Sequence, residues 1–72
     1  MCGIIGINSK KPVSASIINS LKKLEYRGYD SAGIATLSEG CINEVKSEGR
    51  VDNLEKNSVV QNMVGTIGIG HV

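Results

Sequence analysis

The sequence lacks phenylalanine and tryptophan, and its only aromatic residues are Tyr26 and Tyr29. Any core must therefore be aliphatic, and the chain offers nine Ile, seven Val and four Leu for it. A chain of 72 residues buries only about 60% of the surface that its unfolded form exposes. These properties exclude a large self-sufficient enzyme. They allow one small domain, or a piece of a larger one.

The sequence also lacks an excess of charge of either sign and any long hydrophobic run. Eight Lys and Arg residues against seven Asp and Glu residues give a formal charge of +1, without the basic stripe that nucleic-acid binding needs. No apolar run approaches the ~20 residues of a membrane-spanning helix. The first residues do not have the pattern of a secretory signal. We therefore expect a cytoplasmic protein with no nucleic-acid or membrane partner.

Cysteine and histidine are scarce. Cys2, Cys41 and His71 are too few for a disulfide framework or a four-ligand zinc site. A single Cys2–Cys41 disulfide would need an oxidising compartment, which nothing in the sequence indicates. The nine glycines form neither of the spacings typical of loops that bind nucleotide phosphates. We expect no metal and no cofactor.

The hydrophobic pattern predicts an α+β fold. Residues 2–7 form a short, almost uncharged run typical of a strand covered on both faces. Residues 15–27 have apolar side chains at helical spacing, with Ser14 as the expected N-cap and Gly28 as the expected end. Val13 and Ile18 would form a hydrophobic staple. The polar face of this helix is expected to carry four residues: Asn19, Lys22, Lys23 and Glu25.

The second half of the chain predicts mainly strands. A strand over residues 32–37 and a second over Cys41–Glu48 would form a hairpin, with its turn at Glu39 and Gly40. Alternating polar residues suggest that one face of the second strand is wet. Residues 51–63 predict a weak helix. Residues 64–70 predict a buried strand rich in glycine.

Cys2 is the strongest candidate for chemistry. Removal of Met1 would leave Cys2 with a free α-amine, whose ordinary pKa of about 7.7–8.0 suits it to accept the thiol proton. One residue would then supply both nucleophile and base. The alternative is a buried cysteine that acts as a small apolar residue in a strand, and position alone favours this alternative.

A second dense group of polar and aromatic residues follows the predicted helix. Arg27 and Asp30 bracket a glycine turn between Tyr26 and Tyr29. The guanidinium could steady a thiolate, a carboxylate or the backbone of a site walled by the tyrosine rings. The alternative is a helix end, a turn and a surface ion pair worth about 0–1 kcal/mol. Taken alone, this segment favours the alternative.

Three segments together resemble one family. Residues 1–6 read MCGIIG, residues 24–33 read LEYRGYDSAG and residues 68–71 read GIGH. This combination resembles the glutaminase domain of glutamine–fructose-6-phosphate aminotransferase (isomerizing), also called glucosamine-6-phosphate synthase. The short N-terminal motif is shared with other class II glutamine amidotransferases, whereas the ten-residue block is highly specific. The resemblance spans residues 1–72 but covers only the opening part of that domain.

The resemblance implies a fold, a reaction and two site residues. The implied fold is the four-layer α/β/β/α sandwich of the N-terminal nucleophile hydrolases, incomplete in residues 1–72. The implied reaction is hydrolysis of the side-chain amide of L-glutamine by Cys2, with Arg27 in the loop that lines the site. In the family a separate sugar isomerase domain uses the released ammonia to make glucosamine 6-phosphate from fructose 6-phosphate.

The pattern of the family also continues past the last residue of this sequence. Its carboxylate-binding Arg, oxyanion-hole Asn-Gly pair and α-amine acceptor have no counterpart in residues 1–72, and neither has the sugar isomerase domain. We therefore expect a truncated, inactive remnant. Two alternatives are half of a split amidotransferase, active with a complementing chain, and a small interaction module that pairs through a sheet edge.

Overall fold

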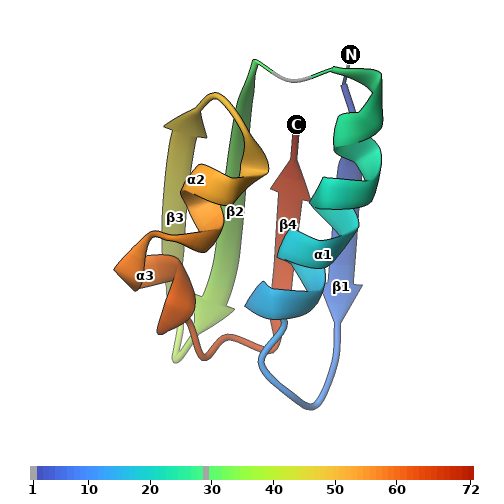
Figure 1. The fold of residues 1–72 in the computed structure, drawn as a ribbon. Helices are drawn as coiled ribbons and strands as arrows, with labels where there is room; N and C mark the ends of the chain where they lie inside the picture. The colour runs from blue at the N-terminus through green and yellow to red at the C-terminus, as the bar shows by residue number, and fades with distance from the viewer. Residues whose placement is uncertain (1, 29) are drawn as a thin grey trace.

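A single antiparallel sheet with helices on one face forms the fold (Figure 1). The computed structural model describes residues 2–28 and 30–72, without the side chain of Arg27. Its elements in chain order are β1 (Ile4–Asn8), α1 (Ser14–Leu24), the 3-10 helix η1 (Glu25–Arg27), β2 (Ser31–Ser38), β3 (Cys41–Glu48), α2 (Val51–Glu55), α3 (Ser58–Gln61) and β4 (Ile67–His71). The expected α+β class is confirmed.

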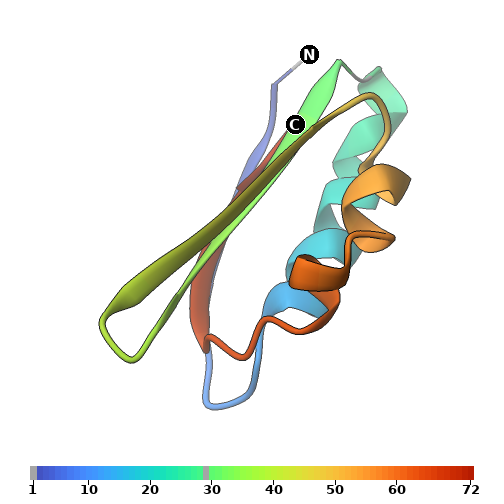
Figure 2. The ribbon, with the colours of Figure 1, turned by 90° about the vertical axis from the view of Figure 1, so that its left-hand side faces the viewer.

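The strands lie in the order β1-β4-β2-β3, and every neighbouring pair is antiparallel. The last strand is therefore inserted between β1 and β2, where Gly70 lies opposite Ile5 on one side and Ile34 on the other. The helices form a second layer on one face of this sheet (Figure 2). None of the helices in the described part of the chain has the length and hydropathy that a membrane crossing requires.

Helix α1 supplies much of the contact between the two layers. Ile17, Ile18 and Leu21 are buried against the sheet, as the spacing of apolar residues predicted. The expected N-cap, Ser14, is wrong: Val13 occupies the cap position without a side-chain hydrogen bond. Val13 is itself buried, and its N–H donates to the carbonyl of Gly65 at 3.0 Å. Burial of Val13 therefore sets the start of the helix in place of a polar cap.

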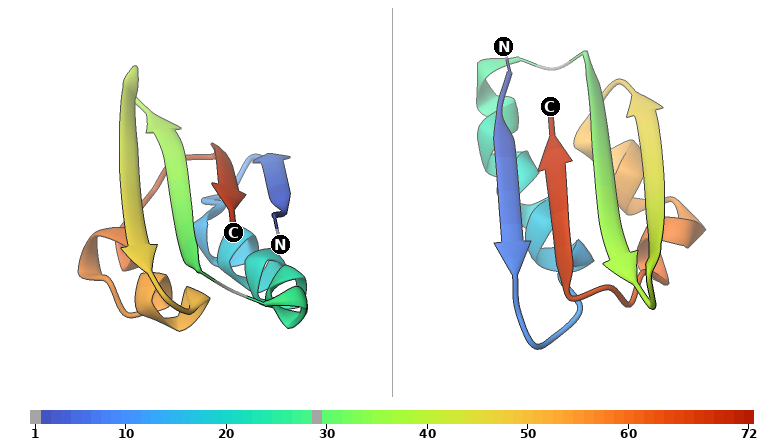
Figure 3. Two further views of the ribbon diagram at one scale, coloured as in Figure 1. Left: turned by 90° about the horizontal axis from the view of Figure 1, so that it is seen from above. Right: turned by 180° about the vertical axis from the view of Figure 1, so that it is seen from behind.

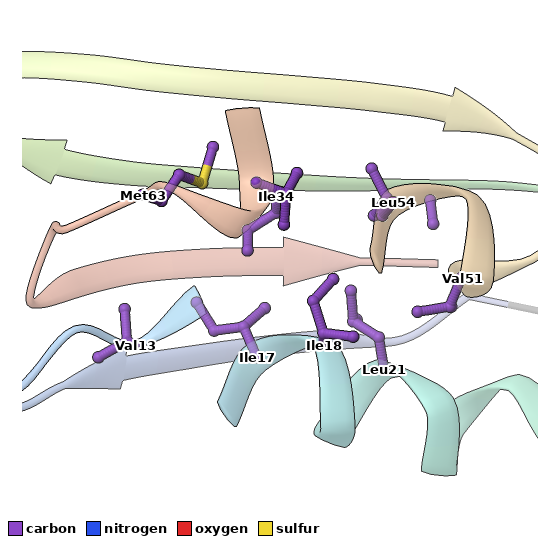
Figure 4. Packing of buried hydrophobic residues seen from close by; sticks show 10 residues of the cluster. Val13, Ile17, Ile18, Leu21, Ile34, Val51, Leu54 and Met63 are labelled. Carbon is purple, nitrogen blue, oxygen red and sulfur yellow. The ribbon is translucent and has the colours of Figure 1, made fainter. Parts of the chain in front are cut away.

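The core lies between α1, the two shorter helices and the sheet (Figure 4). Its buried members are all aliphatic or small: Val13, Ile17, Ile18, Leu21, Ala32, Ile34, Val51, Leu54, Val60 and Met63. An exposed ion pair between Lys22 Nζ and Glu55 Oε1, 2.7 Å apart, joins the outer surfaces of α1 and α2. This hydrogen bond with Glu55 raises the pKa of Lys22.

The predicted helix over residues 51–63 is two short helices. The helix is interrupted at Asn57. The side-chain oxygen of Asn57 accepts hydrogen bonds from the N–H of Val59 at 2.8 Å and from that of Val60 at 3.4 Å. Asn57 is thus the N-cap of α3, and Asn commonly takes this position because its side chain satisfies free helix N–H groups. The sequence pattern predicted the buried positions Val51 and Leu54, but the third expected position, Val59, is 54% exposed and Val60 is buried instead. The pattern did not show the break.

The predicted hairpin is confirmed. Strand β3 has the predicted bounds, and Ser38 pairs with Cys41 across a two-residue turn. Glu39 and Gly40 have φ values of 52° and 78°. A two-residue turn with positive φ at both central residues has the backbone twist that matches the twist of the two hairpin strands.

The expectation that the first and last strands are covered on both faces is wrong for the described residues. Ile4 is 80% exposed, and Ile69 is 58% exposed. In β4 it is Gly68 and Gly70 that face the helices: a Cβ atom on Gly70 would lie 2.5 Å from Cγ2 of Ile17. The view from behind shows the other face of the sheet without a covering layer (Figure 3).

Candidate active site

Cys2 lies at the end of the sheet where β1 begins and β4 ends. Its thiol is free and exposed, so the alternative of a buried cysteine is wrong. The next residue, Gly3, exchanges two backbone hydrogen bonds with Val72, at 3.2 and 3.0 Å. The backbone next to Cys2 is therefore bound to the residue that follows β4, and the start of β1 and the end of β4 lie at the same end of the sheet (Figure 3).

Gly3 allows the first segment of the resemblance, residues 1–6, to pack against the second, residues 24–33. A Cβ atom on Gly3 would lie 2.9 Å from Cδ1 of Leu24, the last residue of α1. This is closer than Cβ atoms approach their neighbours in proteins, so the absence of a side chain lets β1 run beside the end of the helix. The segment over residues 24–33 therefore starts next to the residue that follows Cys2.

Gly33 allows the third segment, residues 68–71, to pack against the second, residues 24–33. Gly33 and His71 are register partners in β2 and β4, and His71 also lies opposite Ile4 of β1. A Cβ atom on Gly33 would lie 2.5 Å from Nε2 of His71. The imidazole thus occupies the place that a side chain on Gly33 would need. The structure gathers all three segments at one end of the sheet.

The turn that carries Arg27 is the short helix η1. Its backbone is closed by the N–H of Gly28, which donates to the carbonyl of Glu25 at 2.9 Å, and Gly28 has a φ of 116° that favours glycine. Gly28 therefore ends the 3-10 helix η1 and not, as predicted, the α-helix, whose C-cap is Glu25. The predicted end of the helix at Arg27 is corrected, because α1 stops at Leu24 and only a 3-10 turn continues.

Three predicted participants fall wholly or partly outside the described residues. Met1 and Tyr29 are not described, and of Arg27 only the backbone is. The proposed pairing of Arg27 with Asp30 and the wall of two tyrosine rings therefore stay predictions. Tyr26 is described and is 75% exposed.

Glu25 is the residue that the sequence analysis placed wrongly. The helical pattern assigned it to the polar face, but it is only 8% exposed. Its Oε2 accepts from the N–H of Val51 at 2.7 Å, and its Oε1 accepts from Nη2 of Arg50 at 3.4 Å. Glu25 follows Leu21 by four residues and Ile18 by seven, so it continues the buried row of α1. The spacing of the apolar residues therefore carried the signal that Glu25 is buried.

Other candidate sites gain no support from the geometry. Cys41 is a free, exposed thiol at the hairpin, which Figure 1 places at the opposite end of the sheet from the N-terminus. Within residues 2–28 and 30–72, no three His, Cys, Asp or Glu side chains are grouped as they would be to hold a metal ion. A hollow of about 260 Å³ beside His71 is bordered by Lys46 and Glu48.

Comparison with known proteins gives one consistent result. The chain is 51% identical over 71 residues to glutamine–fructose-6-phosphate aminotransferase (isomerizing) of Bradyrhizobium diazoefficiens. It is 52% identical over 71 residues to the enzymes of the same name from Brucella suis and Clostridium acetobutylicum. No protein-family model matches the chain. The resemblance indicated by the sequence motifs is therefore confirmed over 99% of this chain, which spans 12% of the length of these curated relatives.

Proposed function

We propose that residues 1–72 form the nucleophile-bearing part of a glutaminase site of the class II amidotransferase type. The observation that carries the proposal is the convergence of three segments at the end of the sheet where the Cys2 thiol is exposed. The similarity to glutamine–fructose-6-phosphate aminotransferases supports it. L-glutamine is the proposed substrate.

In the proposed reaction Cys2 acts as an N-terminal residue after removal of Met1. Its sulfur attacks the side-chain amide carbon of glutamine, and its own α-amine accepts the thiol proton. The tetrahedral intermediate breaks its C–N bond and expels ammonia after protonation of the nitrogen. Water then attacks the thioester that remains, which gives glutamate and restores the thiol.

Arg27 has a supporting role in this proposal. It lies in the turn that follows Leu24, and Leu24 is in contact range of the backbone beside Cys2. A guanidinium from this turn suits a carboxylate ligand, because its planar donors match two carboxylate oxygens. We assign Arg27 to the loop that lines and orders the site.

The sheet also supports the family fold as part of the proposal. Its uncovered face carries exposed apolar side chains on all four strands, including Ile4, Leu37, Ile42, Ile67 and Ile69. An exposed apolar face of this extent is typical of a surface that another layer covers. We propose that a second sheet covers it, as in the four-layer sandwich of the N-terminal nucleophile hydrolases.

We do not assign turnover to residues 1–72 by themselves. On the pattern of the family, these residues hold the nucleophile but not the oxyanion hole, and loss of even one donor of such a hole lowers the rate by about 10²–10³. The sugar aminotransfer that the resemblance implies would need a complementing chain or further residues. An inert remnant and an interaction module are the competing hypotheses.

The proposal is tested by labelling with the diazoketone analogue of glutamine. The two exposed thiols, Cys2 and Cys41, provide an internal control within one molecule. We expect the analogue to modify Cys2 faster than Cys41, and we expect iodoacetamide to show less preference between them. The faster labelling must disappear in Cys2→Ala and persist in Cys41→Ala. Equal labelling of both thiols by the analogue would contradict the proposal and favour the inert remnant.

A further inference from the structure

A buried carboxylate lies next to the proposed site and takes no part in the proposed reaction. Glu25 is the first residue of the turn that ends with Arg27, and its side chain is almost wholly removed from solvent. A buried carboxylate is unfavourable unless hydrogen bonds replace its lost hydration. Its partners are therefore expected to matter for the local structure.

The partners of Glu25 lie on the corner between β3 and α2. The N–H of Val51 donates to Oε2 at 2.7 Å, and the guanidinium of Arg50 reaches Oε1 at 3.4 Å. Val51 is fully buried, and its N–H is at the start of α2, where no intrahelical acceptor is available. Loss of the carboxylate would leave a buried donor without an acceptor.

The same corner also binds the backbone at Asp30, which follows the turn that carries Arg27. The N–H of Gly49 donates to the carbonyl of Asp30 at 2.8 Å. Glu25, at the start of the turn that carries Arg27, and Asp30, further along the chain, are therefore both held by one short segment, residues 49–51. Glu25 is held through its side chain, and Asp30 through its backbone.

We propose that Glu25 is a positioning residue for Arg27: its buried carboxylate clamps the turn that carries Arg27 to the corner formed by residues 49–51. The inference rests on the proposed function, because Arg27 matters only if it faces a substrate. Glu25 does not touch the substrate. It acts by fixing the backbone from which Arg27 extends.

The chain offers matched variants for a test. Glu25→Ala removes both acceptor oxygens, whereas Glu25→Gln keeps one oxygen that can accept from the N–H of Val51. Glu55→Ala is the control, because Glu55 also joins α1 to α2, through Lys22, but does so on the exposed surface. Arg27→Ala shows the effect of losing the positioned group itself.

The readout is the rate at which the diazoketone analogue of glutamine labels Cys2, divided by the rate of alkylation of Cys2 by iodoacetamide. A purely structural role would change both rates together and leave their ratio unchanged. We expect Glu25→Ala to lower the ratio roughly tenfold, because misplacement of a positioning group by about 1 Å can lower a rate by up to about 10². Glu25→Gln should restore most of the ratio, and Glu55→Ala should leave it unchanged.

If the change in the labelling ratio is small, amide hydrogen exchange measures directly whether the corner formed by residues 49–51 has loosened. In Glu25→Ala, faster exchange at Gly49 and Val51, with unchanged exchange at Ile34, would support a local clamp. Uniformly faster exchange throughout the chain would contradict it. If Glu25→Ala does not fold, Glu25→Asp replaces it, and a ratio equal to that of the parent would contradict the proposal.

The two proposals fail in different ways. A low ratio in Arg27→Ala with an unchanged ratio in Glu25→Ala overturns the role of Glu25 and leaves the proposed function standing. No preference of the analogue for Cys2 over Cys41 in the parent chain overturns the proposed function. The positioning role of Glu25 is then overturned with it.

Discussion

The two faces of the sheet differ in a way that the usual rule of apolar residues inside does not describe. On the helix-covered face β4 presents Gly68 and Gly70, while its isoleucines, Ile67 and Ile69, lie on the uncovered face. The glycines let Ile17 of α1 approach the backbone of the sheet closely. Tight contact between two layers can therefore depend on absent side chains as much as on large ones. In β4 the large apolar side chains lie on the uncovered face.

We expect the largest difference in the free energy of unfolding when one isoleucine on each face of the sheet is replaced by alanine. Ile34 on β2 is 2% exposed and Ile69 on β4 is 58% exposed. Ile34→Ala should lower the free energy of unfolding by about 2–5 kcal/mol, because it removes buried methyl groups and leaves a cavity. Ile69→Ala should lower it by less than about 1 kcal/mol. Denaturant unfolding of both variants measures this, and equal losses would contradict the assignment of the faces.

Matched glycines give the next largest difference. A Cβ atom on Gly70 would lie 2.5 Å from Ile17 and 3.0 Å from Leu21, whereas one on Gly6 would have only contacts at 3.9 Å or beyond. Gly70→Ala should therefore destabilise the chain by roughly 1–3 kcal/mol through overpacking. Gly6→Ala, on the open face, should change stability by no more than about 0.5 kcal/mol. The comparison fails if Gly6→Ala is the more damaging change.

A third prediction concerns the close approach of Gly33 and His71 on the open face of the sheet. Gly33→Ala would place a methyl group where the imidazole of His71 lies, so this variant should be destabilised. In the double variant with His71→Ala the clash is absent. A double-mutant cycle should give a coupling of about 0.5–3 kcal/mol, with the double variant more stable than the sum of single effects predicts. Additive effects would show that the two side-chain positions do not meet.

The smallest expected effect is a gain in stability. The hydroxyl of Thr36 is buried on the helix-covered face and has no hydrogen-bond partner among the described residues. Thr36→Val removes this buried polar group at nearly constant volume, so it should raise the free energy of unfolding by up to about 1 kcal/mol. Thermal unfolding provides the measurement. A loss of stability would show that Thr36 has a partner, such as a bound water.

Much of the fold followed from local pattern. The spacing of apolar residues gave α1 and its buried face, and the Glu39-Gly40 turn gave the hairpin with correct bounds for β3. Features that depend on tertiary contact did not follow. The start of α1 is set by burial of Val13, and the insertion of β4 between β1 and β2 pairs residues distant in sequence.

The candidate site shows the same division. Cys2 stood out from its position and Arg27 from its neighbours in the turn, but only the packing shows that Gly3 approaches Leu24 and that Gly33 approaches His71. The burial of Glu25 was the reverse of the prediction, although its spacing from Ile18 and Leu21 continues the buried row of α1. Its partner, the N–H of Val51, comes from a distant segment and leaves no periodic signal in the sequence.

The most direct test of the account is protection of Cys2 by L-glutamine. The alkylation of Cys2 and Cys41 by iodoacetamide would be followed in the same molecule by peptide mass spectrometry, with and without glutamine. We predict that L-glutamine slows alkylation of Cys2 in a saturable manner and leaves Cys41 unaffected. Equal rates for Cys2 with and without glutamine would contradict the claim that this end of the sheet is a glutaminase site.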